Sequence, residues 1–162
     1  MNLNNQDSLD NEERLPMRKK RFDDALEELK NRLREEGVNL SSTEAYEEFA
    51  NFYIEHNRFA DALLFANALV EAIPYSADAW TRKGIILNNL RKPEDAIECY
   101  DTSLQLDPSD PYIYINRGIA FEAMEKSSEA LDNYNQALSI DTENETALLN
   151  KAIILERMGD YD

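Results

Sequence analysis

Few residues in this chain could take part in catalysis. It contains one histidine, His56, and one cysteine, Cys99. A single histidine cannot form a paired-histidine zinc motif, and a single cysteine forms neither an intrachain disulfide nor a cysteine-rich metal site. Acidic pairs such as Glu47 and Glu48 are neighbours in sequence, so on a helix they point apart and do not act as paired catalytic carboxylates. We therefore expect a protein that is not an enzyme and that holds no metal and no cofactor.

The charge balance narrows the classes of partner. The 162 residues include 17 Lys and Arg against 33 Asp and Glu, a formal net charge of −16 at pH 7. A phosphate backbone requires a basic face, so nucleic acid is not an expected partner, and an anionic membrane surface is disfavoured for the same reason. No run is long and apolar enough to span a bilayer, and the first fifteen residues lack the apolar segment of a signal peptide. A cytoplasmic location is the resulting expectation.

Comparison of the chain with itself shows an internal repeat of 34 residues. Residues 77–110 align with residues 111–144, residues 43–76 align one period earlier, and residues 145–162 begin a fourth copy. Similar types recur at fixed places: an aromatic, a small residue, an apolar residue, an alanine, a second aromatic and a proline. In the second copy these are Trp80, Gly84, Leu87, Ala96, Tyr100 and Pro108. The exceptions are Ala66 at the second aromatic place of the first copy and Thr142 at the proline place of the third.

Each copy contains two runs with helical periodicity. In the second copy these are residues 80–90 and residues 94–106, and each run places its apolar residues on one face. The small residues Gly84 and Ala96 let neighbouring helices approach closely. Pro93 and the polar residues before it interrupt the two runs, as a turn between helices does. Each helix pair leaves an apolar face that only the next pair can cover.

This pattern resembles the tetratricopeptide repeat (TPR), and the resemblance covers residues 43–162. It implies an all-α fold, a TPR-type α-solenoid of antiparallel helix pairs that stack into a right-handed superhelix. The expected organisation is an N-terminal arm, a capping helix from a degenerate half repeat, three complete repeats and the first helix of a truncated fourth. The corresponding ranges are residues 1–21, 22–42, 43–76, 77–110, 111–144 and 145–162.

The segment before the first complete repeat carries a weaker repeat signal. Residues 21–26 (RFDDAL) are similar to residues 58–63 (RFADAL), which begin a second helix. The residues from there to Gly37 contain an apolar stripe at helical spacing, formed by Phe22, Leu26, Leu29 and Leu33. Residues 22–36 are interpreted as the second helix of a degenerate earlier repeat or as an unrelated amphipathic helix. In either case we expect it to cover the apolar edge of the first repeat.

The resemblance also implies a binding surface, because in this family the first helices of the repeats face a concave groove. From the second copy onward the groove positions combine apolar side chains with asparagines. An asparagine amide both donates and accepts, which suits an extended peptide backbone. The expected groove residues are Thr81, Arg82, Ile85, Asn88, Asn89, Tyr112, Ile115, Asn116, Ile119, Leu149, Asn150 and Ile153. The alternative is that the recurring isoleucines merely pack between first helices.

The function implied by the resemblance is that of a non-catalytic scaffold or adaptor that binds a protein or peptide. The subclass of the family that clamps chaperone C-terminal carboxylates needs a cation in its first repeat, where this chain has Glu47 and Glu48. A chaperone tail is therefore an unexpected partner. Two alternatives stay open: an N-terminal targeting region of a longer enzyme or regulator, and homotypic assembly through the ends of the solenoid.

The last predicted helix has no second helix after it in this sequence. It carries several large apolar residues, among them Leu148, Leu149 and Ile154, and residues 158–162 resemble the turn that leads into a second helix. A terminal repeat needs a polar outer face, so this apolar face requires a cover. The expectations are a following helix in a longer array, a homodimer through the open end, or fraying of the last helix.

Overall fold

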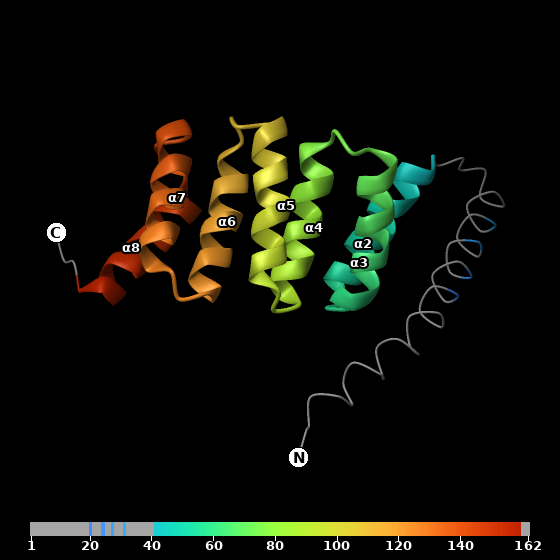
Figure 1. Cartoon of the computed structure of the whole chain (residues 1–162), viewed down its shortest axis with the longest axis horizontal. Coiled ribbons are helices and arrows are strands. Elements are labelled where there is room, and N and C mark those ends of the chain that lie inside the picture. Colours follow the sequence, from blue (N-terminus) through green and yellow to red (C-terminus); the bar gives the residue numbers. More distant parts are fainter. Residues whose placement is uncertain (1–19, 21–23, 25–26, 28–30, 32–40, 160–162) are drawn as a thin grey trace, which may run out of the picture. The chain divides into compact units, whose positions relative to one another are not determined.

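The computed structural model describes residues 20, 24, 27, 31 and 41–159 of the chain (Figure 1). Residues 41–159 form seven α-helices and no strand, which confirms the all-α solenoid expected from the sequence. The chain divides into two compact units, residues 1–68 and residues 69–162, and each is described by itself. The helices are α2 (Ser42–Glu55), α3 (Phe59–Ala72), α4 (Ala77–Asn89), α5 (Pro93–Leu106), α6 (Pro111–Ala123), α7 (Ser127–Ile140) and α8 (Glu145–Met158).

In the first unit, α2 begins at a complete capping box. The Ser41 hydroxyl accepts a hydrogen bond from the backbone N–H of Glu44 at 3.2 Å, and the Glu44 carboxylate accepts one from the backbone N–H of Ser41 at 2.7 Å. The two bonds satisfy N–H groups that the first turn of a helix leaves open. Hydrogen bonds from the backbone N–H and the side chain of Ser41 lower the pKa of the Glu44 carboxyl from its ordinary value.

An aromatic cluster joins α2 to the following helix. The rings of Phe49 and Phe65 stack with their centroids 4.7 Å apart, and the Tyr53 ring lies 5.5 Å from that of Phe65. Ala50 and Ala62, the small residues of this repeat, are fully buried. Small side chains thus let the helices of the first repeat approach, as the sequence predicts.

In the second unit, successive helices pack in chain order. Helix α4 packs against α5, α5 against α6, α6 against α7 and α7 against α8. Figure 1 shows these helices side by side, from green α4 to red α8. Helix α4 also contacts α6 directly, so the first helices of the second and third repeats are neighbours. This arrangement places the side chains of α4 and α6 on one continuous surface.

In α4 and α6 the small residue of the first helix is the contact point for a tyrosine of the second helix. A Cβ atom added to Gly84 would lie 2.5 Å from the Tyr100 ring, and one added to Gly118 would lie 2.6 Å from the Tyr134 ring. Both tyrosines are buried in the core. The close approach predicted from the sequence is therefore confirmed, and the structure identifies the side chain that requires it.

The turn inside each repeat contains a residue in the left-handed region. The sequence alignment predicts the turn, and the structure places His56, Leu90 and Met124 at equivalent helix ends. The next residue in each case has a positive φ, which is 55° for Asn57 and 60° for Arg91 and Glu125. Gly159, one period later, has a φ of 76°. The alignment did not predict this conformation, because only the last of these positions is a glycine.

The predicted N-terminal arm and the predicted helix over residues 22–36 lie largely outside the described residues. Within this stretch, Lys20, Asp24, Glu27 and Asn31 are helical and exposed. At the other end of the chain, the helix predicted to begin at residue 145 corresponds to α8.

Candidate binding surface on the first helices

Helix α6 presents a mixed apolar and amide stripe. Tyr112 is 59% exposed and Ile119 is 37% exposed, and Asn116 lies between them half-buried. Residues spaced by four and three along a helix share one face, so the three side chains form a single row. Exposed large apolar side chains beside an amide are the combination that the sequence predicts for a peptide groove. We call this row the α6 stripe.

Helix α4 contributes a more polar part of the surface. Arg82 pairs with Asp78 on the same helix at 2.9 Å. The Asn89 side-chain amide donates to the backbone carbonyl of Ile85 at 2.9 Å, and the Ile85 side chain is half-buried. The Oδ1 atom of Asn88 is buried and has no hydrogen-bond partner within the described part of the chain.

Helix α8 is linked to α6 and α7 by a polar cluster. The sequence did not predict this cluster as part of the binding surface. The Glu122 carboxylate of α6 accepts a hydrogen bond from the Tyr134 hydroxyl of α7, and it pairs with the Arg157 guanidinium of α8 at 2.9 Å. Asn150 also hydrogen-bonds the Tyr134 hydroxyl, while Ile153 is half-buried. Burial and the bond to Glu122 raise the pKa of Tyr134 well above its ordinary value, so the hydroxyl stays protonated and donates.

Thr81, Ile115 and Leu149 share one repeat position, and in the second and third repeats that position contacts the second helix of the same repeat. The Thr81 hydroxyl lies 2.7 Å from that of Ser103 on α5, and Ile115 is only 3% exposed within a core cluster that includes Tyr134 of α7. Leu149 occupies the same repeat position on α8 and is 61% exposed. This position faces the second helix of its own repeat, and none follows α8 within the described residues.

The residues singled out for possible chemistry have structural roles in this fold. Cys99 is 4% exposed, and burial raises the pKa of its thiol, which disfavours the reactive thiolate. The His56 ring lies 4.2 Å from that of Phe52, and its Nδ1 is 2.7 Å from the Phe52 carbonyl oxygen. Across the described residues, no cluster of His, Cys, Asp or Glu has the arrangement of a metal site, and no helix could cross a membrane.

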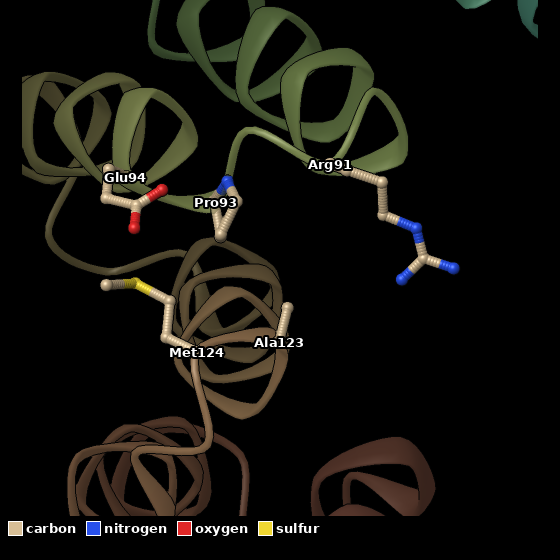
Figure 2. A pocket seen from close by; sticks show the side chains of 5 residues that line it. All are labelled: Arg91, Pro93, Glu94, Ala123 and Met124. Atoms are coloured by element: carbon tan, nitrogen blue, oxygen red, sulfur yellow. The ribbon is translucent and has the colours of Figure 1, made fainter. Parts of the chain in front are cut away.

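A separate pocket lies at the turn end of the second and third repeats. It has a volume of about 340 Å³ and is lined by Arg91, Pro93, Glu94, Ala123 and Met124. Figure 2 shows the Arg91 side chain extending away from Glu94 and Met124. None of these residues belongs to the predicted groove, so the pocket and the α6 stripe are distinct features.

Comparison with known proteins supports the repeat assignment. Tetratricopeptide repeat models match residues 77–110 and residues 111–144. The first TPR of Spaghetti (RPAP3), solved with the HSP90 peptide SRMEEVD, is 22% identical with a TM-score of 0.69 and covers 75% of this chain and 97% of its own. MamA is 20% identical with a TM-score of 0.70 and covers 88% of this chain and 81% of its own. These likenesses show a shared fold.

One curated relative is similar over a shorter stretch. The probable UDP-N-acetylglucosamine–peptide N-acetylglucosaminyltransferase SPINDLY of Arabidopsis thaliana is 35% identical over 60 residues. The match covers 37% of this chain and 7% of the relative, so it includes only a small part of that protein's length.

Proposed function

Because residues 77–144 consist of two repeats of the tetratricopeptide family, we propose that this chain is a protein-interaction module that binds an extended peptide across α4, α6 and α8. The observation that carries the proposal is the α6 stripe, in which two exposed apolar side chains flank the Asn116 amide. Tyr112 and Ile119 supply apolar contacts, and the amide can both donate to and accept from a peptide backbone.

The charges on this surface favour a peptide that binds without a carboxylate clamp. Two guanidinium groups on this surface, those of Arg82 and Arg157, each pair with a carboxylate of the same surface. A C-terminal carboxylate would have to compete with Asp78 or Glu122 for them. We therefore propose peptides with apolar and uncharged side chains as ligands, in preference to acidic chaperone tails.

The test is a selection of peptides from a random library on the full chain, followed by affinity measurements with matched variants. Ile119→Glu should weaken a selected peptide by at least about tenfold, because it puts a charge into an apolar contact. Asn116→Ala should weaken it by about 1–3 kcal/mol if backbone bonds to the amide are lost. Neither variant should lower the melting temperature.

The matched control is Ile140→Glu, which makes the same change at an isoleucine of similar exposure, 42%, on the second helix α7. Selected peptides that bind Ile119→Glu and Ile140→Glu equally well would place the site elsewhere. The peptide SRMEEVD, titrated in parallel, should bind more weakly than the selected peptides, and tight binding of SRMEEVD would contradict the proposed peptide chemistry.

The similarity to SPINDLY favours a second candidate function, in which this chain is the targeting region of a longer enzyme. Sequencing the complete transcript tests it directly. A catalytic domain in the same reading frame would support this candidate, and a reading frame restricted to repeats would leave the independent interaction module as the function.

A further inference from the structure

One apolar side chain of the first unit is exposed where its counterparts are buried. Phe52 in α2 occupies the repeat position of Ile86 in α4, Ala120 in α6 and Ile154 in α8. The three counterparts are 0–1% exposed, whereas Phe52 is 48% exposed. A large aromatic side chain left half in water is an unfavourable arrangement that burial against another helix would relieve.

The other repeats show what normally covers this position. Ile154 belongs to a core cluster with Ala130, Tyr134 and Ala137, all on α7, the second helix of the preceding repeat. Helix α5 packs in the same way against α6, which carries Ala120. This position of a first helix therefore receives the second helix that precedes it in the chain. Within the described residues, α2 has no preceding second helix.

We propose that residues 22–36 of this same chain occupy that place and pack on Phe52 as α7 packs on Ile154. Their sequence supports the assignment, because RFDDAL at residues 21–26 is similar to RFADAL at residues 58–63, where α3 begins. The sequence of the segment is amphipathic, and its apolar stripe, which contains Leu26 and Leu29, could pack on Phe52.

The described residues of this stretch identify its polar side. The four residues that are helical and exposed have spacings of four, three and four, so they lie on one face: Lys20, Asp24, Glu27 and Asn31. In the sequence the apolar stripe is displaced from them by two residues, which corresponds to about 200° around a helix and therefore to the opposite face of a continuous helix. In the proposed arrangement, that face contacts α2.

The length of the connection fits the same arrangement. Four residues separate each second helix from the next first helix in the other repeats: residues 73–76, 107–110 and 141–144. Residues 37–41, only one residue more, separate the proposed segment from the start of α2 at Ser42. A connection of this length keeps consecutive helices adjacent, so the segment reaches Phe52 of its own chain.

Thiol labelling of the full chain tests the proposal. Phe52→Cys introduces a thiol at the covered position, while the native Cys99 is buried and reacts slowly. In this background, Leu26→Lys should raise the rate of reaction with iodoacetamide by about tenfold or more, because it removes an apolar contact of the segment. The neighbouring change Glu27→Lys, on the exposed polar face, should leave the rate unchanged.

Equal labelling rates in the two variants would overturn the proposal. Protection that grows with protein concentration would also overturn it, because a second copy would then be the occupant. A chain that retains Phe52 provides an independent measurement, since Leu26→Lys should lower its melting temperature and Glu27→Lys should not. This inference does not depend on the proposed peptide site, and its failure would leave that site untouched.

Discussion

At the scale of single residues, the two helices of the second repeat pack closely because Gly84 has no side chain. Alanine is a better helix former than glycine by about 1 kcal/mol, so propensity alone favours Gly84→Ala. The added Cβ would lie 2.5 Å from the buried Tyr100 ring, however, and relieving that overlap costs about 1–3 kcal/mol. We predict that Gly84→Ala lowers the free energy of unfolding by about 1–2 kcal/mol, measured by urea denaturation.

The equivalent position on α8 provides the control for this prediction. Ala152 is exposed, because no second helix follows α8 in the described residues. Ala152→Gly should therefore cost only the difference in helix propensity, about 0.5–1 kcal/mol. If Gly84→Ala proved neutral or stabilising, the Tyr100 ring would have to move aside freely, and close packing of the two helices would not explain the glycine.

At the scale of secondary-structure elements, the repeat alignment predicts the helices because apolar residues recur at helical spacing throughout residues 43–158. The same spacing does not separate groove positions from adjacent packing positions. Thr81 and Arg82 are neighbours in sequence, yet the Thr81 hydroxyl contacts Ser103 of α5 and Arg82 pairs with Asp78. Adjacent residues lie about 100° apart around a helix, so one can face the groove while the next contacts the neighbouring helix. The sequence of one helix does not show where that neighbouring helix lies.

The sequence patterns did not predict the contacts that long polar side chains make between helices. Glu122 and Arg157 are far apart in sequence and meet only because α6 and α8 lie in consecutive repeats. A basic residue recurs directly before the small position of the first helix, as Lys83 and Arg117. The structure shows that its ring contact also recurs, with Lys83 5.3 Å from the Trp80 ring and the Arg117 guanidinium 5.7 Å from the Tyr114 ring.

Arg117 connects three helices, and its removal should weaken their association. Its Nε donates to Asn133 of α7 at 2.8 Å, and its Nη1 pairs with Asp101 of α5 at 2.5 Å. Asn133 is 4% exposed, so Arg117→Ala leaves a buried oxygen without its donor. We predict a loss of about 1–3 kcal/mol in the free energy of unfolding, most of it from Asn133, because Asp101 is half exposed.

The control for Arg117 is a basic residue whose ion pair is exposed on both sides. Lys92 and Asp95 lie 4.0 Å apart with both side chains 57% exposed, so Lys92→Ala should change the stability by less than about 0.5 kcal/mol. Equal effects of the two substitutions in chemical denaturation would contradict the bridging role of Arg117.

At the scale of the whole molecule, each repeat is stabilised by its neighbours. Among the described residues of the second unit, no second helix covers α8. Leu148 and Leu149 are 47% and 61% exposed, at positions whose counterparts Tyr114 and Ile115 are partly or fully buried. Gly159 already has the left-handed conformation found in the turns of the other repeats.

Supplying a second helix should stabilise this end of the chain. Appending a copy of residues 129–140 after Asp162 continues the 34-residue register, because residue 163 then corresponds to Glu129. Covering a leucine contributes roughly 1.5–3 kcal/mol, so the extended chain should melt at a higher temperature and lose any self-association seen by light scattering.

The same extension with Asp in place of the copied Tyr134 should give no such gain, because a charge would then face Ala152. An extension that left the melting temperature unchanged would show that the leucines of α8 are already covered, and a concentration-dependent melting temperature of the original chain would identify a second copy as the cover.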